Sequence, residues 1–324
     1  MLGPLDRIKL WSVGGGKGGI GKSLVSLGLG ICLAKLGKKV VLIDGDLGGA
    51  NLHTLMGVRF PPVTLEHFLL KKVSRLEDTV LETQIPGIGL ICGADDLLGA
   101  ANPTYAQKMR LLQQIEALPA QYVILDLGAG TSYNLLDFFN YSPGKIVVCT
   151  GQATALQNAY GFIKSALYRK LTRDFAKADQ VLKLLYHSGG AEAEGNHLSL
   201  RDLQTQLAKA MPEQHARLSQ ALAEFHLYLM VNMVKSQADL RAPEIIKTVC
   251  QDFLALTPEI LGSVPYEPAV EAAVNQMNPF PLTKKKNKAT TALEEIAMKI
   301  LKASRLPKWL ASRENHDEDR KSVV

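Results

Sequence analysis

The segment at 14–23, GGGKGGIGKS, combines glycines, lysines and a serine in a spacing suited to binding phosphate. It follows an apolar stretch at 8–13 and leads into a predicted helix over 22–36. A glycine-rich turn before a helix N-terminus favours anions, because glycines allow positive φ and the backbone N–H groups point at the ligand. The last eight residues match G-x-x-x-x-G-K-[ST], in which Lys22 would reach the β- and γ-phosphates and Ser23 would ligate Mg²⁺. The residues expected to bind the nucleotide are Gly16, Gly18, Gly19, Ile20, Gly21, Lys22 and Ser23.

Acidic residues follow two other apolar runs, each of which is predicted to be a strand. Asp44 ends the run at 40–43, and Asp126 ends the run at 122–125. The carboxyl ends of parallel strands meet at one edge of a sheet, so both aspartates are expected near the glycine-rich loop. There they could serve a Mg²⁺ ion, Asp126 through water, while Asp46 could orient an attacking water. A solvated turn is the simpler interpretation of an isolated Asp-x-Asp.

Lys17 gives the loop a second lysine at its start. The pattern K-G-G-x-G-K-[ST] resembles the deviant Walker A motif of the MinD/ParA group of P-loop ATPases. In that family the early lysine reaches across a nucleotide-sandwich dimer to the partner's phosphates. The resemblance therefore implies a catalytic role for Lys17 and an ATP-bridged homodimer. The alternative is an ordinary solvated lysine.

Two further segments resemble the switch regions of the same family, in its MinD and flagellar FlhG branch. The stretch at 44–52 resembles switch I, which implies that Asp46 orients the hydrolytic water and that Asn51 organises the γ-phosphate side. His53 departs from the pattern, because an acidic residue is common there. The segment at 126–130 resembles a Walker B strand end with a switch II, and implies that Gly128 contacts the nucleotide.

The remaining resemblance concerns residues that contact the base of the nucleotide. Asn232 ends an apolar strand and matches the adenine-contacting asparagine of the family, and Pro265 and Tyr266 match the loop that flanks the base. Because no N-K-x-D guanine signature follows Asn232, ATP is preferred over GTP. The segment at 150–160 resembles the family's T-x-E-P-T region but lacks its Glu-Pro pair.

Apolar runs and helical patterns alternate along the chain, which predicts an α/β fold of the P-loop NTPase type. We expect a mostly parallel twisted sheet with helices on both faces. The interval at 172–226 breaks the alternation and is predicted to be a helical insertion. The expected organisation is one ATPase domain over 1–305, followed by a polar tail at 306–324. The predicted strands are 8–13, 40–43, 88–91, 122–125, 146–149, 227–231 and 262–264.

The composition of the chain indicates its cellular environment and the kinds of partner it could bind. The chain has 324 residues, 47% of them hydrophobic, and four dispersed cysteines without a C-x-x-C, so neither a disulfide framework nor a zinc site is indicated. The net charge of +6 and the lysine cluster at 284–288 favour phosphates or anionic lipid, although a solvated loop is the simpler interpretation. A cytoplasmic protein is expected. A peripheral position on the inner face of the cell membrane is an alternative, because the basic-aromatic patch at 308–310 could act as a weak membrane anchor.

The helix predicted over 293–304 has two interpretations. Its apolar residues fall on one face, which suits either a core-packing helix or an amphipathic membrane helix. Packing in the core is favoured.

The leading functional hypothesis is a slow, Mg²⁺-dependent ATPase that dimerises with ATP and acts as a spatial regulator of division, flagellar or other machinery. Its activator and cargo are not identified by the sequence. The alternatives are a ParA-like ATPase that partitions DNA or other cargo, a metallocluster carrier, and a cofactor-biosynthesis amidoligase of the same fold. Non-specific DNA binding stays open but no feature indicates it.

Overall fold

The computed structural model describes residues 8–93, 103–189, 199–279 and 287–304. Three features discussed above fall outside these ranges: the lysines at 284–286, the patch at 308–310 and the tail at 306–324.

An eight-stranded sheet forms the centre of the described structure, with the strand order β3-β4-β2-β5-β1-β6-β7-β8. All neighbouring strands are parallel except β3 and β4, which are antiparallel. The fold class predicted from the sequence is therefore confirmed. The strands are β1 (Lys9–Gly14), β2 (Val40–Asp44), β3 (Leu81–Glu82), β4 (Ile88–Ile91), β5 (Tyr122–Asp126), β6 (Gly144–Cys149), β7 (Tyr228–Val234) and β8 (Glu259–Pro265).

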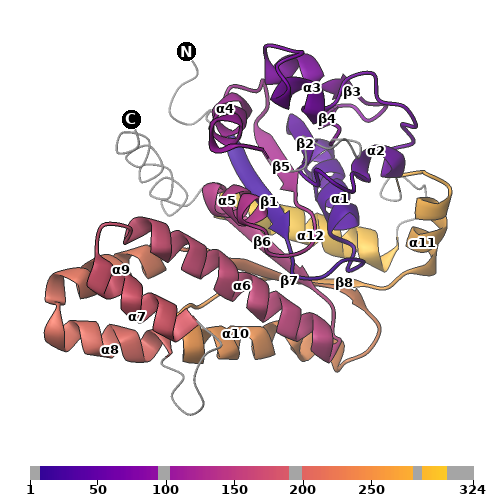
Figure 1. Cartoon of the computed structure of the whole chain (residues 1–324). Coiled ribbons are helices and arrows are strands. Elements are labelled where there is room, and N and C mark those ends of the chain that lie inside the picture. The colour runs from indigo at the N-terminus through magenta and orange to yellow at the C-terminus, as the bar shows by residue number, and fades with distance from the viewer. Residues whose placement is uncertain (1–7, 94–102, 190–198, 280–286, 305–324) are drawn as a thin grey trace.

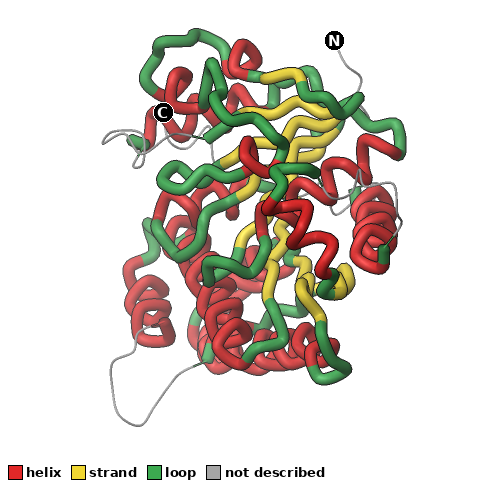
Figure 2. Tube along the Cα trace, turned by 90° about the vertical axis from the view of Figure 1, so that its right-hand side faces the viewer, coloured by secondary structure: helices red, strands yellow, loops and turns green. Residues whose placement is uncertain are grey.

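Helices cover both faces of this sheet (Figures 1 and 2). The helices of the chain's first half are α1 (Lys22–Lys35), α2 (Leu52–Leu55), α3 (Leu65–Leu69), α4 (Tyr105–Ile115) and α5 (Tyr133–Tyr141), with a 3₁₀ turn η1 (Leu76–Thr79). Those of the second half are α6 (Ala153–Asp174), α7 (Asp179–Gly189), α8 (Leu200–Ala210), α9 (Pro212–Glu224), η2 (Asp239–Arg241), α10 (Ala242–Leu254), α11 (Pro268–Asn275) and α12 (Lys288–Ala303).

Two hydrophobic cores result, one on each face of the sheet. Successive strand side chains point to opposite faces, so Trp11 and Val13 join one core while Leu10 joins the other. The first core lies between the sheet and the helices α1 and α12, and the second lies between the sheet and α4, α5, α6 and α10. Because both faces are buried, the parallel strands are continuous apolar runs rather than alternating ones.

Helix α12 packs against α1 and β8, as its contacts and burial show. Leu293, Ile296 and Ile300 are each at most 2% exposed. The core-packing interpretation of this helix is therefore confirmed. Among the described residues, no helix combines the length and the apolar character that crossing a bilayer requires.

The described part of 172–226 is helical, and comprises the end of α6 together with α7, α8 and α9. Figure 1 shows these helices stacked beside α6 and α10. Their buried leucines, such as Leu185, Leu203 and Leu218, belong to the same core cluster as the adjoining face of the sheet. The division of the chain into an ATPase domain over 1–305 and a tail stays a prediction.

Candidate nucleotide-binding site

The loop at 14–23 connects β1 to α1 in a conformation that depends on glycine. Gly19 and Gly21 have φ values of 73° and 81°, which side-chain-bearing residues rarely adopt. A Cβ atom at Gly16 would overlap the backbone carbonyl oxygen of Asn158, whereas one at Gly18 would have Ala129 as its nearest neighbour, at 4.0 Å. Glycine is therefore required at some loop positions by backbone conformation and at others by close packing.

Lys22, the first residue of α1, is buried within this loop. Only 8% of it is exposed, and its Nζ donates a hydrogen bond to the carbonyl oxygen of Lys17 at 3.3 Å. Burial lowers the pKa of the Lys22 ammonium, while the carboxylates of Asp126 and Asp46 act in the opposite direction. A partly desolvated lysine whose ammonium lies over its own phosphate-binding loop can contact phosphate oxygens of a nucleotide bound there.

Asp126 lies at the carboxyl end of β5, next to β1, and is 1% exposed. Its Oδ1 accepts a hydrogen bond from Ser26 Oγ at 2.8 Å, and Ser23 also donates to this carboxylate. Burial raises its pKa to about 6, although the two serines and Lys22 favour the charged form. Sequence reasoning missed Ser26. Its spacing of three residues from Ser23 on one helix was the available signal.

Asp44 faces Asp126 across two neighbouring strands, because the two residues are partners in the β2–β5 register. Burial and the nearby Asp126 charge raise its pKa to about 7. Its Oδ2 accepts hydrogen bonds from the backbone N–H groups of Asn51 and Leu52 at 2.9 and 3.0 Å, and its Oδ1 accepts one from Asp46 at 3.2 Å. Asp44 therefore anchors the loop at 46–52, a role the sequence did not suggest. Its place in a Mg²⁺ shell stays a prediction.

Asp46 lies at the start of the same loop, directly against Gly128. A Cβ atom at Gly128 would come within 2.9 Å of the Asp46 carboxylate, so glycine permits this approach. Asn51 is exposed and its Nδ2 donates to the Gly49 carbonyl oxygen at 2.5 Å. The structure therefore brings Asp46, Lys22 and Asp126 together, while the Asn51 side chain turns back onto its own loop.

Lys17 differs from Lys22 in being exposed. Its Nζ lies 3.4 Å from Oγ1 of Thr154, in the first turn of α6. The segment at 150–160 thus touches the early lysine of the loop, which sequence reasoning did not anticipate.

Asn232, in β7, reaches the loop from the other side. It is 3% exposed, and its Nδ2 donates to the carbonyl oxygen of Ile20 at 2.9 Å. Pro265 ends the adjacent strand β8, where Tyr266 donates its backbone N–H to Val234 at 2.9 Å. The structure places these residues at the loop's end of the sheet. The adenine contact predicted for Asn232 and Pro265 is not tested by this geometry.

The donor set fits a nucleotide with Mg²⁺. The loop offers backbone N–H groups and an ammonium for phosphates, and Ser23 with Asp126 offers oxygens. Within the described ranges, no group of three or more His, Cys, Asp or Glu residues could hold a metal ion. In proteins, Mg²⁺ is usually bound by one or two carboxylates together with water and substrate phosphates.

A glycine-rich loop between the central strand and a helix, a buried lysine and a carboxylate on the next strand define a P-loop nucleotide-binding protein. The family described as the CobQ/CobB/MinD/ParA nucleotide binding domain matches residues 11–280, and the chain belongs to this family.

Curated relatives and solved structures agree with this assignment. The flagellum site-determining protein YlxH of Helicobacter pylori is 32% identical over 48% of this chain and 53% of its own length. The antiactivator FleN of Pseudomonas aeruginosa is 28% identical over 50% of this chain and 58% of its own length. The chain thus matches little more than half of each relative. The septum site-determining protein MinD of Pyrococcus horikoshii, solved with Mg-ADP, has the same fold, with a TM-score of 0.62 at 21% identity over 92% of this chain and 98% of its own.

Proposed function

We propose that this protein is a Mg²⁺-dependent ATPase that dimerises when it binds ATP and acts as a spatial regulator of a larger cellular structure. The family assignment and the donor set of the loop support nucleotide binding. The names of the relatives, one a flagellum site-determining protein and one an antiactivator, support a regulatory role over a metabolic one.

Most of the predicted site residues receive a role in this scheme. Bound Mg²⁺–ATP supplies the phosphoanhydride bond and the cation that offsets its charge. The amides at 16–22 and the Lys22 ammonium bind and orient the phosphates. Ser23 and Asp126 would hold the metal with its water, and Asp46 would orient the attacking water. Asn232 and Pro265 flank the base.

The proposal of an ATP-induced dimer is supported by the contrast between the two lysines of the loop. Lys22 is buried and directed at its own loop, whereas Lys17 is exposed, with Thr154 as its hydrogen-bond partner among the described residues. A contact of 3.4 Å with a surface hydroxyl holds an ammonium only weakly. Lys17 is therefore available to the phosphates of a second subunit.

Light scattering with and without ATP tests the assignment. Lys17→Ala is expected to abolish ATP-induced dimers while fluorescent-nucleotide binding to the monomer stays unchanged, and to reduce turnover about 10³-fold, as for arginine fingers. Lys209→Ala, an exposed lysine on α8, is the matched control. Asp46→Ala is expected to bind ATP and accumulate as a dimer. A stable ATP dimer in the Lys17 variant, or full hydrolysis in the Asp46 variant, refutes these roles.

Partner and location are tested in the same assay. ATP turnover measured with DNA and with anionic liposomes separates a ParA-like partitioning ATPase from a membrane-associated MinD-like one, because each surface should stimulate only its own class. The activator and cargo are then sought by capture on the ATP-trapped Asp46→Ala dimer. A cluster-carrier role finds no support in the cysteines, because all four are buried.

A further inference from the structure

Strand β7 contains a methionine in a backbone conformation that side-chain-bearing residues rarely adopt. Met233 has a φ of 56°, in the left-handed region, although it lies inside a strand. Among the described residues, the other non-glycine residues with a positive φ each lie at or just beyond the carboxyl end of a helix, and they are Lys71, Ala255 and Met277. A left-handed residue is common at a helix end. Met233 has no such explanation, and strained backbone of this kind is typical of functional sites.

The left-handed residue coincides with a bulge in the pairing of β7 with β8. Val231 pairs with Ser263 and Val234 pairs with Pro265, so β7 advances by three residues where β8 advances by two. The extra residue of β7 therefore lies within 232–233. Bulges of this kind redirect side chains and are frequent beside binding sites.

Both residues of the bulge reach the phosphate loop at Gly21. A Cβ atom at Gly21 would overlap Asn232 Nδ2 and would lie 3.3 Å from Met233 Cε. The Asn232 Nδ2 also donates to the carbonyl oxygen of Ile20 at 2.9 Å. Neighbouring residues of a regular strand point to opposite faces of the sheet. The bulge breaks this alternation, and it thereby allows two consecutive side chains to meet at one glycine of the loop.

Gly21 is the last loop residue before α1, and its position determines where Lys22 lies. It is the N-cap of α1, and its carbonyl oxygen accepts a hydrogen bond from the backbone N–H of Val25 at 3.0 Å. Contacts that fix Gly21 therefore fix the start of the helix and the residue that follows. In the sheet, β6 separates β7 from β1, so these contacts come from a strand outside the loop's own strand–helix unit.

We propose that Met233 is a positioning residue that holds the phosphate loop in its binding conformation before a nucleotide arrives. Its left-handed backbone directs the Asn232 amide to Ile20, and its own flexible thioether packs on Gly21. Because Met233 acts through the loop, it favours the phosphate groups of a ligand whatever base is attached to them. This inference deepens the proposed nucleotide site and rests on it.

Substitution by glycine separates the side chain of Met233 from its backbone. Glycine adopts a positive φ readily, so Met233→Gly keeps the bulge and removes the thioether. Isoleucine resists this conformation, so Met233→Ile is expected to displace Asn232 as well. Met277→Gly is the matched control, because Met277 is also half-buried and has a φ of 54°, but it follows α11. Both glycine variants relieve the same strain and add freedom to the unfolded chain, so their melting temperatures without ligand are expected to shift alike.

Affinities of the full-length protein for Mg²⁺–ADP and for inorganic tripolyphosphate, which has no base, test this role. Both ligands are measured by displacement of a fluorescent nucleotide. Met233→Gly is expected to weaken both by the same factor of about five, which corresponds to the loss of one or two buried methylene groups. Met233→Leu, which restores an apolar side chain, is expected to regain most of this affinity. Met233→Ile is expected to lose at least tenfold, and Met277→Gly is expected to bind as the parent does.

Several results would overturn the positioning role. One is unchanged affinity of Met233→Gly for both ligands, and another is an equal loss in Met277→Gly. A loss for ADP without a loss for tripolyphosphate would assign Met233 to the base or ribose instead of the loop. A parent that binds ADP but not tripolyphosphate would show that the loop is not preformed for phosphate. A parent that binds neither ligand would refute the proposed nucleotide site itself.

Discussion

The two aspartates at the nucleotide site make the stability of the ligand-free protein depend on pH. The pKa of Asp126 is raised from 3.8 to about 6 by burial, so the native state keeps this proton to a higher pH than the unfolded chain does. Its contribution to stability is therefore full below about pH 4 and is lost as the pH rises through about 6. Two pKa units correspond to about 3 kcal/mol, of which about half is lost above pH 5.

Replacing Asp126 with Asn removes this loss. It also removes the charge that, after burial, is the second cause of the raised pKa of Asp44. We therefore expect the free energy of unfolding of Asp126→Asn, relative to the parent, to rise by about 2 kcal/mol between about pH 5 and about pH 8. The variant also leaves Lys22 without one attractive carboxylate. This loss changes the free energy of unfolding of the variant relative to the parent, but not the way in which that difference varies with pH.

Urea unfolding at a series of pH values, with chelator and without nucleotide, measures this difference. The comparison with the parent is essential because the contribution of Lys145 to stability changes with pH in the opposite direction. Burial lowers the pKa of Lys145 to about 7, so its contribution to stability is present at high pH and is lost as the pH falls through about 7. That effect is common to both proteins and cancels. A difference that stays constant across this pH range would falsify the account of the buried pair.

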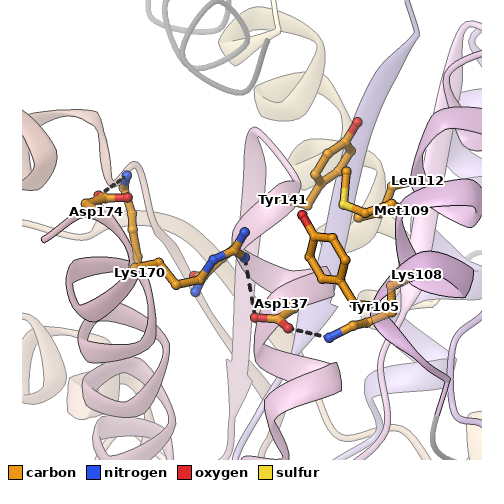
Figure 3. Close-up of a pocket in the computed structure, with 10 residues that line it drawn as sticks. Tyr105, Lys108, Met109, Leu112, Asp137, Tyr141, Lys170 and Asp174 are labelled. Carbon is orange, nitrogen blue, oxygen red and sulfur yellow. Dashed lines mark hydrogen bonds and ion pairs between the residues drawn. The ribbon is translucent and has the colours of Figure 1, made fainter. Parts of the chain in front are cut away.

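Two further substitutions test contacts within the described structure. Asp137→Asn is expected to destabilise the protein by about 3–5 kcal/mol at neutral pH, because it leaves the buried Lys108 without its ion-pair partner (Figure 3). Thermal unfolding followed by circular dichroism measures this change. A small change in stability would contradict the prediction. Gly16→Ala is expected to abolish binding of a fluorescent ATP analogue, since its Cβ would overlap the Asn158 carbonyl oxygen, whereas Gly18→Ala has room and should retain binding. Equal affinities for the two variants would contradict the described loop.

The central strands and the loop were predictable because their signals are local. Short apolar runs that end in Asp, such as Val40–Asp44 and Tyr122–Asp126, are typical of buried parallel strands. The two-residue strand Leu81–Glu82 was missed because a pair of half-exposed and exposed residues has no periodicity. Helix α10 was also missed, although Ile246, Cys250 and Leu254 are buried at a spacing of four.

The site could be predicted only where residue type and spacing coincide. The glycines, Lys22 and the strand-end aspartates share a motif or a strand position, whereas contacts between distant helices leave no pattern. The Asp137 cluster is of the second kind, because Lys108, Asp137 and Arg169 come from three helices. Likewise, the anchoring of the loop at 46–52 by Asp44 depends on how this loop turns back onto the end of β2.

The hydrogen bond from Asn232 to Ile20 joins residues 212 positions apart, and this separation has a consequence for synthesis. Chains emerge from the ribosome N-terminus first, at about 5–20 residues per second. The phosphate loop is therefore made roughly 10–40 seconds before the asparagine that supports it. A nascent chain carries the complete loop sequence long before it carries the finished loop, so nucleotide affinity is expected to arise late in translation, when β7 joins the sheet.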